Sequence, residues 1–358
     1  MIILGIESTC DETSAAVVID GHDVRSNVIA SQVEIHAKYR GVVPEIASRA
    51  HIENILPVLR ESLEIAGKTF DDIDAIAVAH RPGLIGSLLI GVTAAKTLAW
   101  SLNKPLIAVD HVQAHLYSVA LDLENRDDPE NRDGSYLFPD ENRDGSYLFP
   151  AVGLVISGGH TSLYRVDDWT HITRLGSTID DAVGEAYDKV AAILGLGYPG
   201  GPIIDELAAT SDPQAVRFPR TMLGRESLDF SFSGLKTAVL YHVRGVPGRD
   251  AKGIDLNDKN VRDIAAGFQA ACVDVITKKL DRAVRRTQAK SVIIGGGVSA
   301  NRGLRAALAK LPVPVRLPPM QFCTDNAAMS AGLADVYFRE GRSSPLDLDA
   351  ITHSQFRD

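Results

Sequence analysis

The sequence has few cysteines and no long uninterrupted hydrophobic run. Cysteine occurs three times, at the widely separated positions Cys10, Cys272 and Cys323. No disulfide framework is therefore expected, and the chain fits a reducing compartment. The longest apolar stretch, residues 84–95, ends at Lys96 and is shorter than the ~20 residues that a membrane-spanning helix needs. We therefore expect a protein without a membrane segment.

The chain also lacks an excess of positive charge. Its 37 lysines and arginines against 46 aspartates and glutamates give a net charge of −9. Attraction to a phosphate backbone must therefore come from local patches or from a partner protein. The opening residues, MIILGIEST, have no basic segment ahead of the apolar ones, which is unlike a signal peptide. We expect a cytoplasmic protein.

Length and composition indicate a folded protein of about two domains. The chain has 358 residues, of which 45% are hydrophobic and 23% charged. These values are ordinary for a globular protein, and each domain can bury a sizeable core. Disordered and fibrous classes are excluded.

The two halves of the chain show the same order of predicted elements. In the first half, three β-rich runs precede a helix, and strands then alternate with helices, at 2–8, 13–20, 24–31, 44–66, 74–80, 86–102 and 106–110, with a further helix from His111. The second half repeats this order at 151–157, 161–166, 171–177, 180–194, 291–296, 301–310, 313–317 and 325–339. The pattern predicts an α/β fold built twice, with parallel sheet cores, antiparallel hairpin edges and a site in the cleft between the halves.

A short segment is duplicated near the middle of the chain. ENRDGSYLFP occurs at 130–139 and again at 141–150, which is too short a period for a repeat architecture. We interpret it as a duplicated flexible surface loop. The predicted division is an N-terminal lobe at 1–122, this loop at 123–150, a C-terminal lobe with a helical insertion at 151–340, and a tail at 341–358.

Polar or glycine-rich turns follow three predicted strands. GIESTCDET places Asp11 and Glu12 between two strands, and VISGGHT places Ser157, Gly158 and Gly159 at the equivalent point of the second half. Backbone amides in such turns can face an anion. GGGVSAN opens a helix beside Asn301, where a nucleotide can meet a helix N-terminus. Each turn alone fits an ordinary hairpin, and the three together indicate a nucleotide site.

Two histidines have the spacing of metal ligands. His111 and His115 lie four residues apart on a predicted helix, so both imidazoles share one face. HVQAH lacks the glutamate of a zinc-protease helix, which argues against peptide hydrolysis. Asp325 in QFCTDNAAM can supply a third ligand, and such a set suits a divalent metal, iron among them. The alternative is a pair of unrelated surface histidines.

Two aspartates flank a Gly-Tyr-Pro-Gly-Gly turn. Asp188 and Asp205 can accept the hydroxyl groups of a ribose. Helix capping or surface ion pairs explain them equally well.

Basic residues cluster in two segments of the second half. One segment contains Lys278, Lys279, Arg282, Arg285, Arg286 and Lys290, and the other contains Arg217, Arg220 and Arg225. Such clusters are most often solvated faces, and the alternative is a set of phosphate contacts to a polynucleotide.

Taken together, these segments resemble the tRNA adenosine threonylcarbamoyltransferase (TsaD) family. The resemblance covers nearly the whole chain, in the family's order, through the blocks GIESTCDET, HAKYRGVVPEIASRAH, RPGLIGSLLIG, DHVQAHLYS, LVISGGHT, DDAVGEAYDKVA, YPGGP, FSFSGLKTAV, GGGVSAN and CTDNAAM. It implies the duplicated actin, Hsp70 and sugar-kinase (ASKHA) fold, with two lobes around a nucleotide cleft. It also implies transfer of a threonylcarbamoyl group from threonylcarbamoyl-adenylate to N6 of adenosine 37 in tRNAs that read codons beginning with A.

The resemblance further implies a set of site residues and partners. His111, His115 and Asp325 would hold one divalent metal per subunit, iron(II) or else zinc(II). Substrate contacts would fall on Val155, Ile156, Ser157, Gly158, Gly159, Asp188, Gly201, Asp205 and Asn301. The implied partners are threonylcarbamoyl-adenylate, tRNA, a TsaB-type paralogue and a TsaE-type ATPase. Because the adenine amine must lose a proton, we expect Asp11 or Glu12 to relay it.

Two residues depart from the family pattern. Arg40 and Arg81 stand where the family often has glycine, and both add charge near the expected tRNA face. Two other functions remain open from the sequence, a nucleotide-dependent kinase or ATPase of the same fold and a non-catalytic nucleotide-binding scaffold.

Overall fold

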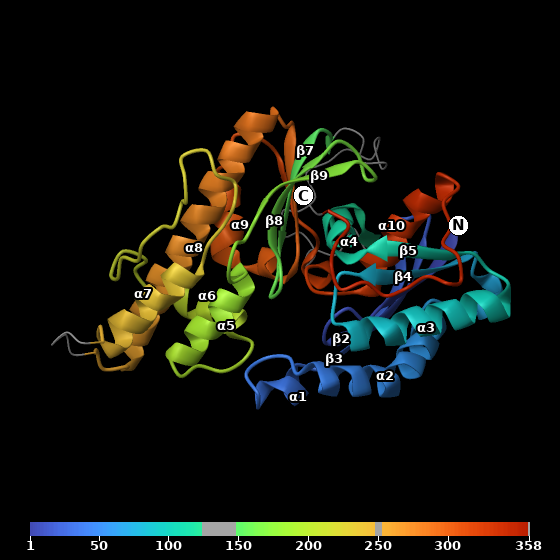
Figure 1. The fold of residues 1–358 in the computed structure, drawn as a ribbon, viewed down its shortest axis with the longest axis horizontal. Coiled ribbons are helices and arrows are strands. Elements are labelled where there is room, and N and C mark those ends of the chain that lie inside the picture. Colours follow the sequence, from blue (N-terminus) through green and yellow to red (C-terminus); the bar gives the residue numbers. More distant parts are fainter. Residues whose placement is uncertain (124–147, 248–252, 357–358) are drawn as a thin grey trace. The chain divides into compact units, whose positions relative to one another are not determined.

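A computed structural model describes residues 1–123, 148–247 and 253–356 of the chain (Figure 1). The chain divides into two compact units. Among the described residues, the first unit contains 1–123, 167–172 and 317–356, and the second contains 148–166 and 173–316. Most of the duplicated segment at 130–150 lies outside the described residues.

The first unit is built on a mixed sheet. Its strands are β1 (Ile2–Glu7), β2 (Glu12–Ile19), β3 (Asp23–Ser31), β4 (Ala75–Arg81), β5 (Leu106–Asp110) and β6 (Asp122–Leu123). The strand order is β5-β4-β1-β2-β3-β6. β1 pairs antiparallel with β2 and parallel with β4, which in turn pairs parallel with β5. The predicted parallel core with an antiparallel hairpin edge is confirmed here.

Helices of the first unit cover both faces of this sheet. They are α1 (Val33–Ala37), α2 (Pro44–Ile65), α3 (Ile85–Leu102), α4 (His111–Tyr117) and α10 (Ala327–Arg339). Because side chains alternate along a strand, Leu4 and Ile6 share one face of β1 and form a core with residues of α2 and α3. Gly5 and Glu7 belong to the opposite face. α10 packs there so closely that a β-carbon at Gly5 would collide with the Ala327 carbonyl oxygen.

The second unit repeats the arrangement of strands. Its strands are β7 (Ala151–Ile156), β8 (Thr161–Val166), β9 (Ile172–Ser177), β10 (Ser291–Gly295) and β11 (Val315–Arg316). The order β11-β10-β7-β8-β9 matches β5-β4-β1-β2-β3 element for element. β7 is antiparallel to β8 and parallel to β10. The predicted duplication is therefore confirmed.

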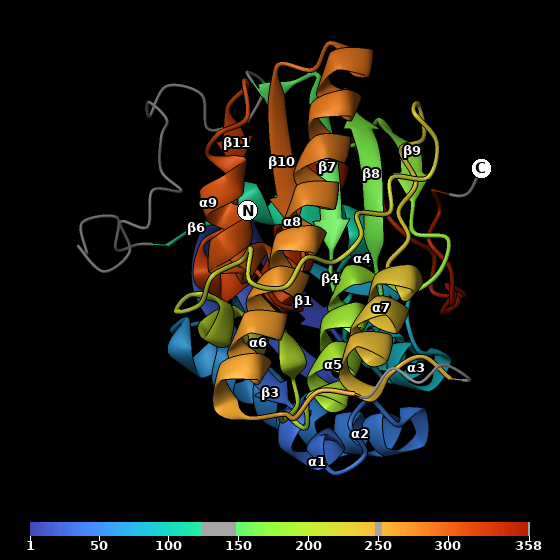
Figure 2. The same cartoon turned by 90° about the vertical axis from the view of Figure 1, so that its left-hand side faces the viewer.

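Helices pack against the second sheet and against one another. They are α5 (Val183–Ile193), α6 (Gly200–Ala208), α7 (Ser233–Arg244), α8 (Asp258–Thr287) and α9 (Arg302–Leu308). Figure 2 shows the long helix α8 crossing the sheet in front of β7, and α8 contacts β7, β8, β10, α6, α7 and α9. α8 therefore connects the sheet of this unit with three of its helices.

The last helix belongs to a different unit from the one that element order suggests. The sequence placed 325–339 in the second lobe, whereas α10 packs against β1, β2, β4 and α4 of the first unit. The physical reason is the shape of β1. Gly5 has no side chain, so the backbone of α10 at Ala327 and the small side chain of Ala331 can approach β1 closely.

One helix is longer than its apolar stretch suggests. α3 (Ile85–Leu102) is long and apolar enough to cross a membrane by length and composition, although residues 84–95 had been expected to be too short. In the first unit its buried face packs against β4 and α2. A core helix of a soluble protein has the same composition.

Candidate functional site

Helix α4 carries the two histidines on one face. Asp110 caps its N-terminus, since the carboxylate accepts hydrogen bonds from the Val112 amide at 3.0 Å and the Gln113 amide at 3.3 Å. His111 and His115 lie one turn apart, with ring centroids separated by 4.5 Å. Both side chains are buried. The alternative of two unrelated surface histidines is excluded by this burial.

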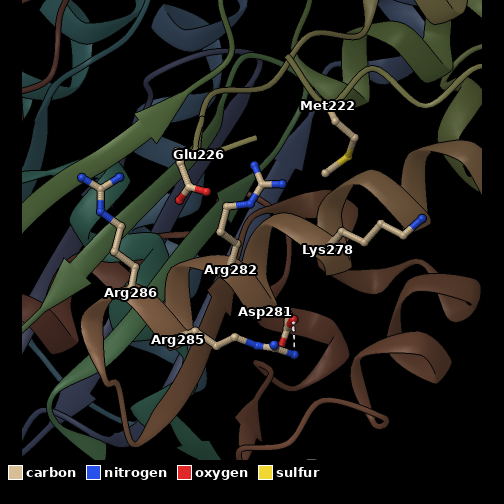
Figure 3. Close-up of a pocket in the computed structure, with 7 residues that line it drawn as sticks. All are labelled: Met222, Glu226, Lys278, Asp281, Arg282, Arg285 and Arg286. Atoms are coloured by element: carbon tan, nitrogen blue, oxygen red, sulfur yellow. Dashed lines mark hydrogen bonds and ion pairs between the residues drawn. The ribbon is translucent and has the colours of Figure 1, made fainter. Parts of the chain in front are cut away.

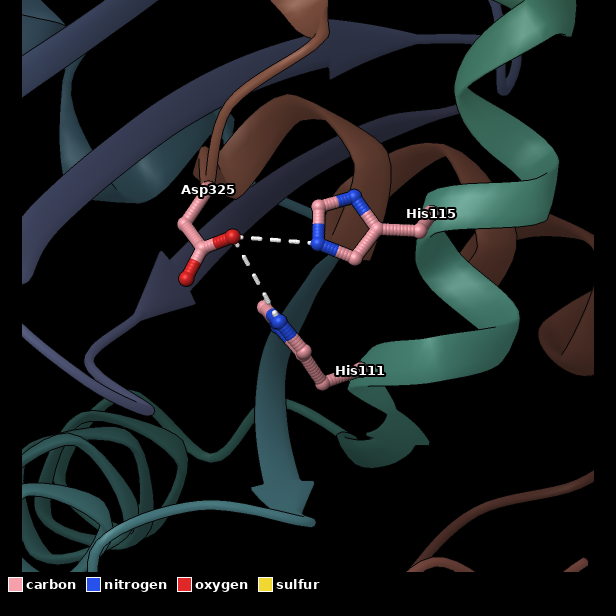
Figure 4. Close-up of side chains that lie close together, drawn as sticks. All are labelled: His111, His115 and Asp325. Carbon is pink, nitrogen blue, oxygen red and sulfur yellow. Dashed lines mark hydrogen bonds and ion pairs between the residues drawn. The ribbon is translucent and has the colours of Figure 1, made fainter. Parts of the chain in front are cut away.

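Asp325 faces both imidazoles. Its Oδ1 lies 3.0 Å from His115 Nε2 and 3.5 Å from His111 Nε2, and Figure 4 shows both rings pointing at this oxygen. One ligand atom from each residue falls within 4.8 Å of the others. Two nitrogen donors and one carboxylate oxygen, converging in a largely buried place, suit a divalent transition metal. The cluster predicted from the sequence fits such an ion.

Glu7 contacts His111 at Nδ1, the ring nitrogen that faces away from Asp325. Its Oε2 lies 3.2 Å from His111 Nδ1 and accepts a hydrogen bond from Ser330 Oγ at 3.3 Å, and its Oε1 accepts one from the Thr9 amide at 2.9 Å. A carboxylate on Nδ1 fixes the ring so that Nε2 faces Asp325. Glu7 is fully buried. Glu7 is not among the site residues predicted from the sequence, although it ends β1 directly before the polar turn.

The surroundings of this cluster shift the pKa values of the two histidines in opposite directions. Burial lowers the pKa of His111, but the carboxylates of Glu7 and Asp325 outweigh it and raise that pKa to about 9. Burial and the neighbouring His111 lower the pKa of His115. The acidic surroundings thus favour a positive charge on the side of His111, as a cation site requires.

Asp11 and Glu12 lie at the turn from β1 to β2. Asp11 is buried, and its backbone oxygen accepts a hydrogen bond from the Gln32 amide at 3.1 Å. Burial and the charges of Asp325 and Asp11 raise the pKa of Glu12 well above its usual range. Glu12 therefore interacts electrostatically with Asp325, the carboxylate that faces both imidazoles.

Arg81 is tied to the cap of α4. Its Nη2 donates to Gln355 Oε1 at 2.6 Å, and its Nε lies 3.7 Å from Asp110. Asp110 also accepts hydrogen bonds from Ser354 Oγ and the Gln355 amide. Arg81, a departure from the family pattern, therefore contacts both the C-terminal segment and the residue that caps α4.

In the second unit, the turn 157–159 follows the carboxyl end of β7. The Ser157 amide donates to the His160 carbonyl at 2.8 Å, and the Ser157 carbonyl accepts from the Gly184 amide at 3.2 Å. A β-carbon on Gly158 or Gly159 would meet no atom within 4 Å. The protein's own packing therefore does not require these glycines, and the space beside them is open.

The end of β10 closely approaches the end of β7. Gly296 has a φ of +93°, and a β-carbon there would collide with the Ile156 carbonyl oxygen. Val155 and Ile156 are fully buried. The two parallel strands thus bring their carboxyl ends together, the edge at which open α/β sheets bind ligands.

Asp205 and Asn301 are joined through Gln269. Gln269 donates to Asp205 Oδ1 at 3.0 Å and accepts from Asn301 Nδ2 at 2.7 Å, and it also accepts from Tyr187 Oη at 3.3 Å. Asp205 Oδ2 accepts from the Arg302 side chain at 2.9 Å. Gln269 is not among the site residues predicted from the sequence, because it lies within a mostly apolar, buried stretch of α8.

Asp188 has a structural partner. Its Oδ1 accepts a hydrogen bond from the Gly200 amide at 2.7 Å, at the first turn of α6, which supports helix capping. A β-carbon on Gly201, the next residue, would meet nothing within 4 Å. Gly201 thus resembles Gly158 and Gly159 in leaving open space.

Comparison with known proteins identifies the family. A family model described as tRNA N6-adenosine threonylcarbamoyltransferase (TsaD) matches residues 23–131 and 138–332. Proteins with that name from Moorella thermoacetica and Symbiobacterium thermophilum are each 48% identical, covering 98% of this chain and 95% of their own.

Solved structures show the same fold at low sequence identity. The component A protein of (R)-2-hydroxyglutaryl-CoA dehydratase from Acidaminococcus fermentans is 16% identical, with a TM-score of 0.51, over 96% of this chain and 100% of that one. This likeness supports the predicted ASKHA-type α/β architecture. On the evidence of its sequence blocks, its duplicated sheets and its relatives, the chain belongs to the tRNA N6-adenosine threonylcarbamoyltransferase (TsaD) family.

Proposed function

We propose that this protein transfers the threonylcarbamoyl group of threonylcarbamoyl-adenylate to N6 of adenosine 37 in tRNAs that read codons beginning with A. The family match supports a transferase that acts on tRNA. The observation that carries the proposal within this chain is the convergence of His111, His115 and Asp325 on one point.

These three residues would hold one divalent metal, iron(II) or zinc(II). The donor set supports such an ion, because two imidazole nitrogens and a carboxylate oxygen leave coordination positions open. When bound, the ion would supply a Lewis acid for negative charge that develops on the acyl oxygen. Glu7 orients His111 by holding its Nδ1 at 3.2 Å.

Residues of the second unit would bind the adenylate. The open turn at Ser157, Gly158 and Gly159 would present the amides of its two glycines to the phosphate. Asp205 is oriented by Gln269 and Arg302 and would accept the ribose hydroxyls, beside Asn301. Val155, Ile156, Asp188 and Gly201 would complete this site.

Asp11 or Glu12 would take the proton that leaves N6. In the reaction, the amine nitrogen forms a bond to the activated carbonyl carbon, AMP departs, and the amine loses a proton. Burial raises the pKa of Glu12, and a carboxylate with a raised pKa is a stronger base than an ordinary one.

The reaction would take place in the cytoplasm, where tRNA is modified. We propose a TsaB-type paralogue and a TsaE-type ATPase as partners, on the basis of the family resemblance. The net charge of −9 supports a need for help in holding a polyanion.

The test is a reconstituted modification reaction. Purified protein is incubated with threonylcarbamoyl-adenylate, unmodified tRNA and the two partners, singly and together, and tRNA nucleosides are analysed by mass spectrometry. The proposal expects threonylcarbamoyl-adenosine, and no product from tRNA that carries guanosine at position 37. Absence of product under every combination would reject the transferase.

Nothing in the comparisons favours the kinase or ATPase alternative. The variant His111→Ala distinguishes the non-catalytic scaffold from the proposed enzyme. A scaffold would lose bound metal and still support modification, whereas the proposed enzyme would lose both.

A further inference from the structure

The second unit has a pocket that the proposed reaction does not use. It lies between the C-terminal half of α8 and the loop at 222–226, and it has a volume of about 600 Å³. Four cationic side chains line it, Lys278, Arg282, Arg285 and Arg286 (Figure 3). This volume falls within the range that accommodates a drug-sized or nucleotide-sized group.

The cations occupy one face of α8. Positions 278, 282, 285 and 286 follow the three- and four-residue spacing that aligns side chains on a helix. Asp281 and Glu226 also line the pocket, and Asp281 pairs with Arg285 at 2.8 Å. Four cations against two carboxylates leave the pocket positive on a chain whose net charge is −9.

Buried contacts fix the wall of the pocket. Lys279 is fully buried and donates to the carbonyls of Met222 at 3.0 Å and Ser227 at 3.1 Å. Arg282 donates to the Ser227 carbonyl at 2.7 Å. These hydrogen bonds hold the loop against α8. Lys278, Arg285 and Arg286 do not take part in them.

Two of the cations, Lys278 and Arg286, are available to a ligand. Within the described residues, neither Lys278 nor Arg286 takes part in an ion pair, and both are exposed. The other basic cluster differs, because Arg220 pairs with Asp274 at 2.9 Å and also donates to the Phe218 carbonyl.

We propose that this pocket, whose lining residues are all different from those proposed to bind the adenylate, binds the phosphate backbone of the tRNA substrate. The inference rests on the proposed function for the identity of the RNA. Arginine forms bidentate hydrogen bonds with phosphate, and three of the four cations are arginines. Since the chain as a whole is acidic, a local basic pocket supplies the attraction to RNA that the net charge does not.

The test compares two triple variants that each remove three positive charges. The pocket variant is Lys278→Gln, Arg285→Gln and Arg286→Gln. The control is Lys259→Gln, Arg262→Gln and Lys310→Gln, which changes residues on α8 and after α9 outside the pocket. Each variant is assembled with the partner proteins, and tRNA affinity is measured by fluorescence anisotropy between 50 and 300 mM salt, a range of roughly sixfold over which phosphate contacts change affinity strongly.

The pocket variant should bind tRNA about tenfold more weakly or worse, with the slope of log affinity against log salt reduced by about 2. Its KM for tRNA should rise, and its KM for threonylcarbamoyl-adenylate should match that of the control. The control should stay within about twofold of the unmodified protein, because distant surface charges are screened.

Equal tRNA affinity and equal salt slopes for the two variants would overturn the inference. If the pocket variant keeps its tRNA affinity as an isolated chain but no longer assembles with a partner, the pocket is a protein interface, and the inference is also wrong. Failure of the unmodified protein to modify tRNA would instead reject the proposed function. Matching circular dichroism and melting temperatures establish that both variants fold.

Discussion

The Nδ1 atom of His111 lies 3.2 Å from the Oε2 atom of Glu7, on the opposite side of the ring from the Nε2 atom that faces Asp325. Glu7 reaches this place because it follows Gly5 by two residues and so shares its face of β1. The sheet thus supplies a carboxylate that sets the orientation of His111, a candidate metal ligand carried by helix α4.

Glu7→Gln should weaken metal binding. The amide keeps the shape of the side chain but loses the charge that orients His111, and loss of such a partner typically costs 10- to 100-fold in metal affinity. Affinity is measured by competition with a chromogenic chelator under anaerobic conditions. Glu64→Gln, at an exposed site near the end of α2, is the matched control. Equal affinity for both variants would show that Glu7 does not orient the site.

Glycines that leave open space should differ in effect from a glycine that the fold requires. Gly296→Ala forces a side chain into a φ of +93° and against the Ile156 carbonyl, so the free energy of unfolding should fall by about 3 kcal/mol or more. Gly158→Ala should change it by less than about 1 kcal/mol, and yet raise the KM for threonylcarbamoyl-adenylate.

Chemical denaturation and steady-state kinetics check these two expectations. Gly41→Ala, where a β-carbon also meets nothing within 4 Å, is the control for the kinetic effect. If Gly158→Ala and Gly41→Ala leave the KM equally unchanged, the turn at 157–159 does not contact the substrate.

The buried amine of Lys279 should make stability depend on pH. Burial lowers its pKa to about 8, below the ~10.4 of an exposed lysine. Between these values the unfolded chain binds more protons than the folded one, so the free energy of unfolding should rise with pH from about 8 to 10.5, by roughly 3 kcal/mol. Below about pH 8 the lysine is protonated in both states, so it no longer makes the free energy of unfolding depend on pH.

Lys279→Met should remove this rise, because the replacement does not titrate. Urea denaturation at pH 7, 8, 9 and 10 measures the effect, with exposed Lys259→Met on the same helix as the control. Parallel curves for the two variants would contradict the expectation.

Arg40 occupies a backbone conformation that favours glycine. Its φ is +58°, and a left-handed conformation costs a residue with a β-carbon roughly 1–2 kcal/mol. Arg40→Gly should therefore raise the free energy of unfolding by up to about 1 kcal/mol, since glycine also gains entropy in the unfolded chain. Thermal denaturation checks this, and a lower melting temperature would contradict it.

Local patterns in the sequence predicted much of the fold. Alternating β-rich runs and helical spacing located the hairpins and both sheets, and the four-residue spacing of His111 and His115 placed the imidazoles on one face. Local patterns could not predict that α10 belongs to the first unit. That outcome depends on close packing at Gly5, which is a contact between segments more than 300 residues apart.

The residues that the sequence missed are those that act through long-range contacts. Glu7 and Gln269 lie in runs of buried residues, where nothing in the local pattern distinguishes a polar core residue from an orienting one. Lys279 was grouped with an exposed basic cluster, whereas its side chain is fully buried. Burial of a lysine depends on carbonyl acceptors from a distant loop, and spacing along α8 does not reveal them.

The most direct test of the account measures metal content and tRNA modification together in His111→Ala. Protein is prepared anaerobically, its metals are quantified by mass spectrometry, and threonylcarbamoyl-adenosine is measured after reaction with threonylcarbamoyl-adenylate, tRNA and the partner proteins. The account predicts about one divalent ion per chain in the unmodified protein, as one such ligand set holds a single ion, and loss of both metal and product in the variant. A variant that has lost its metal and still modifies tRNA at the unmodified protein's rate would contradict it.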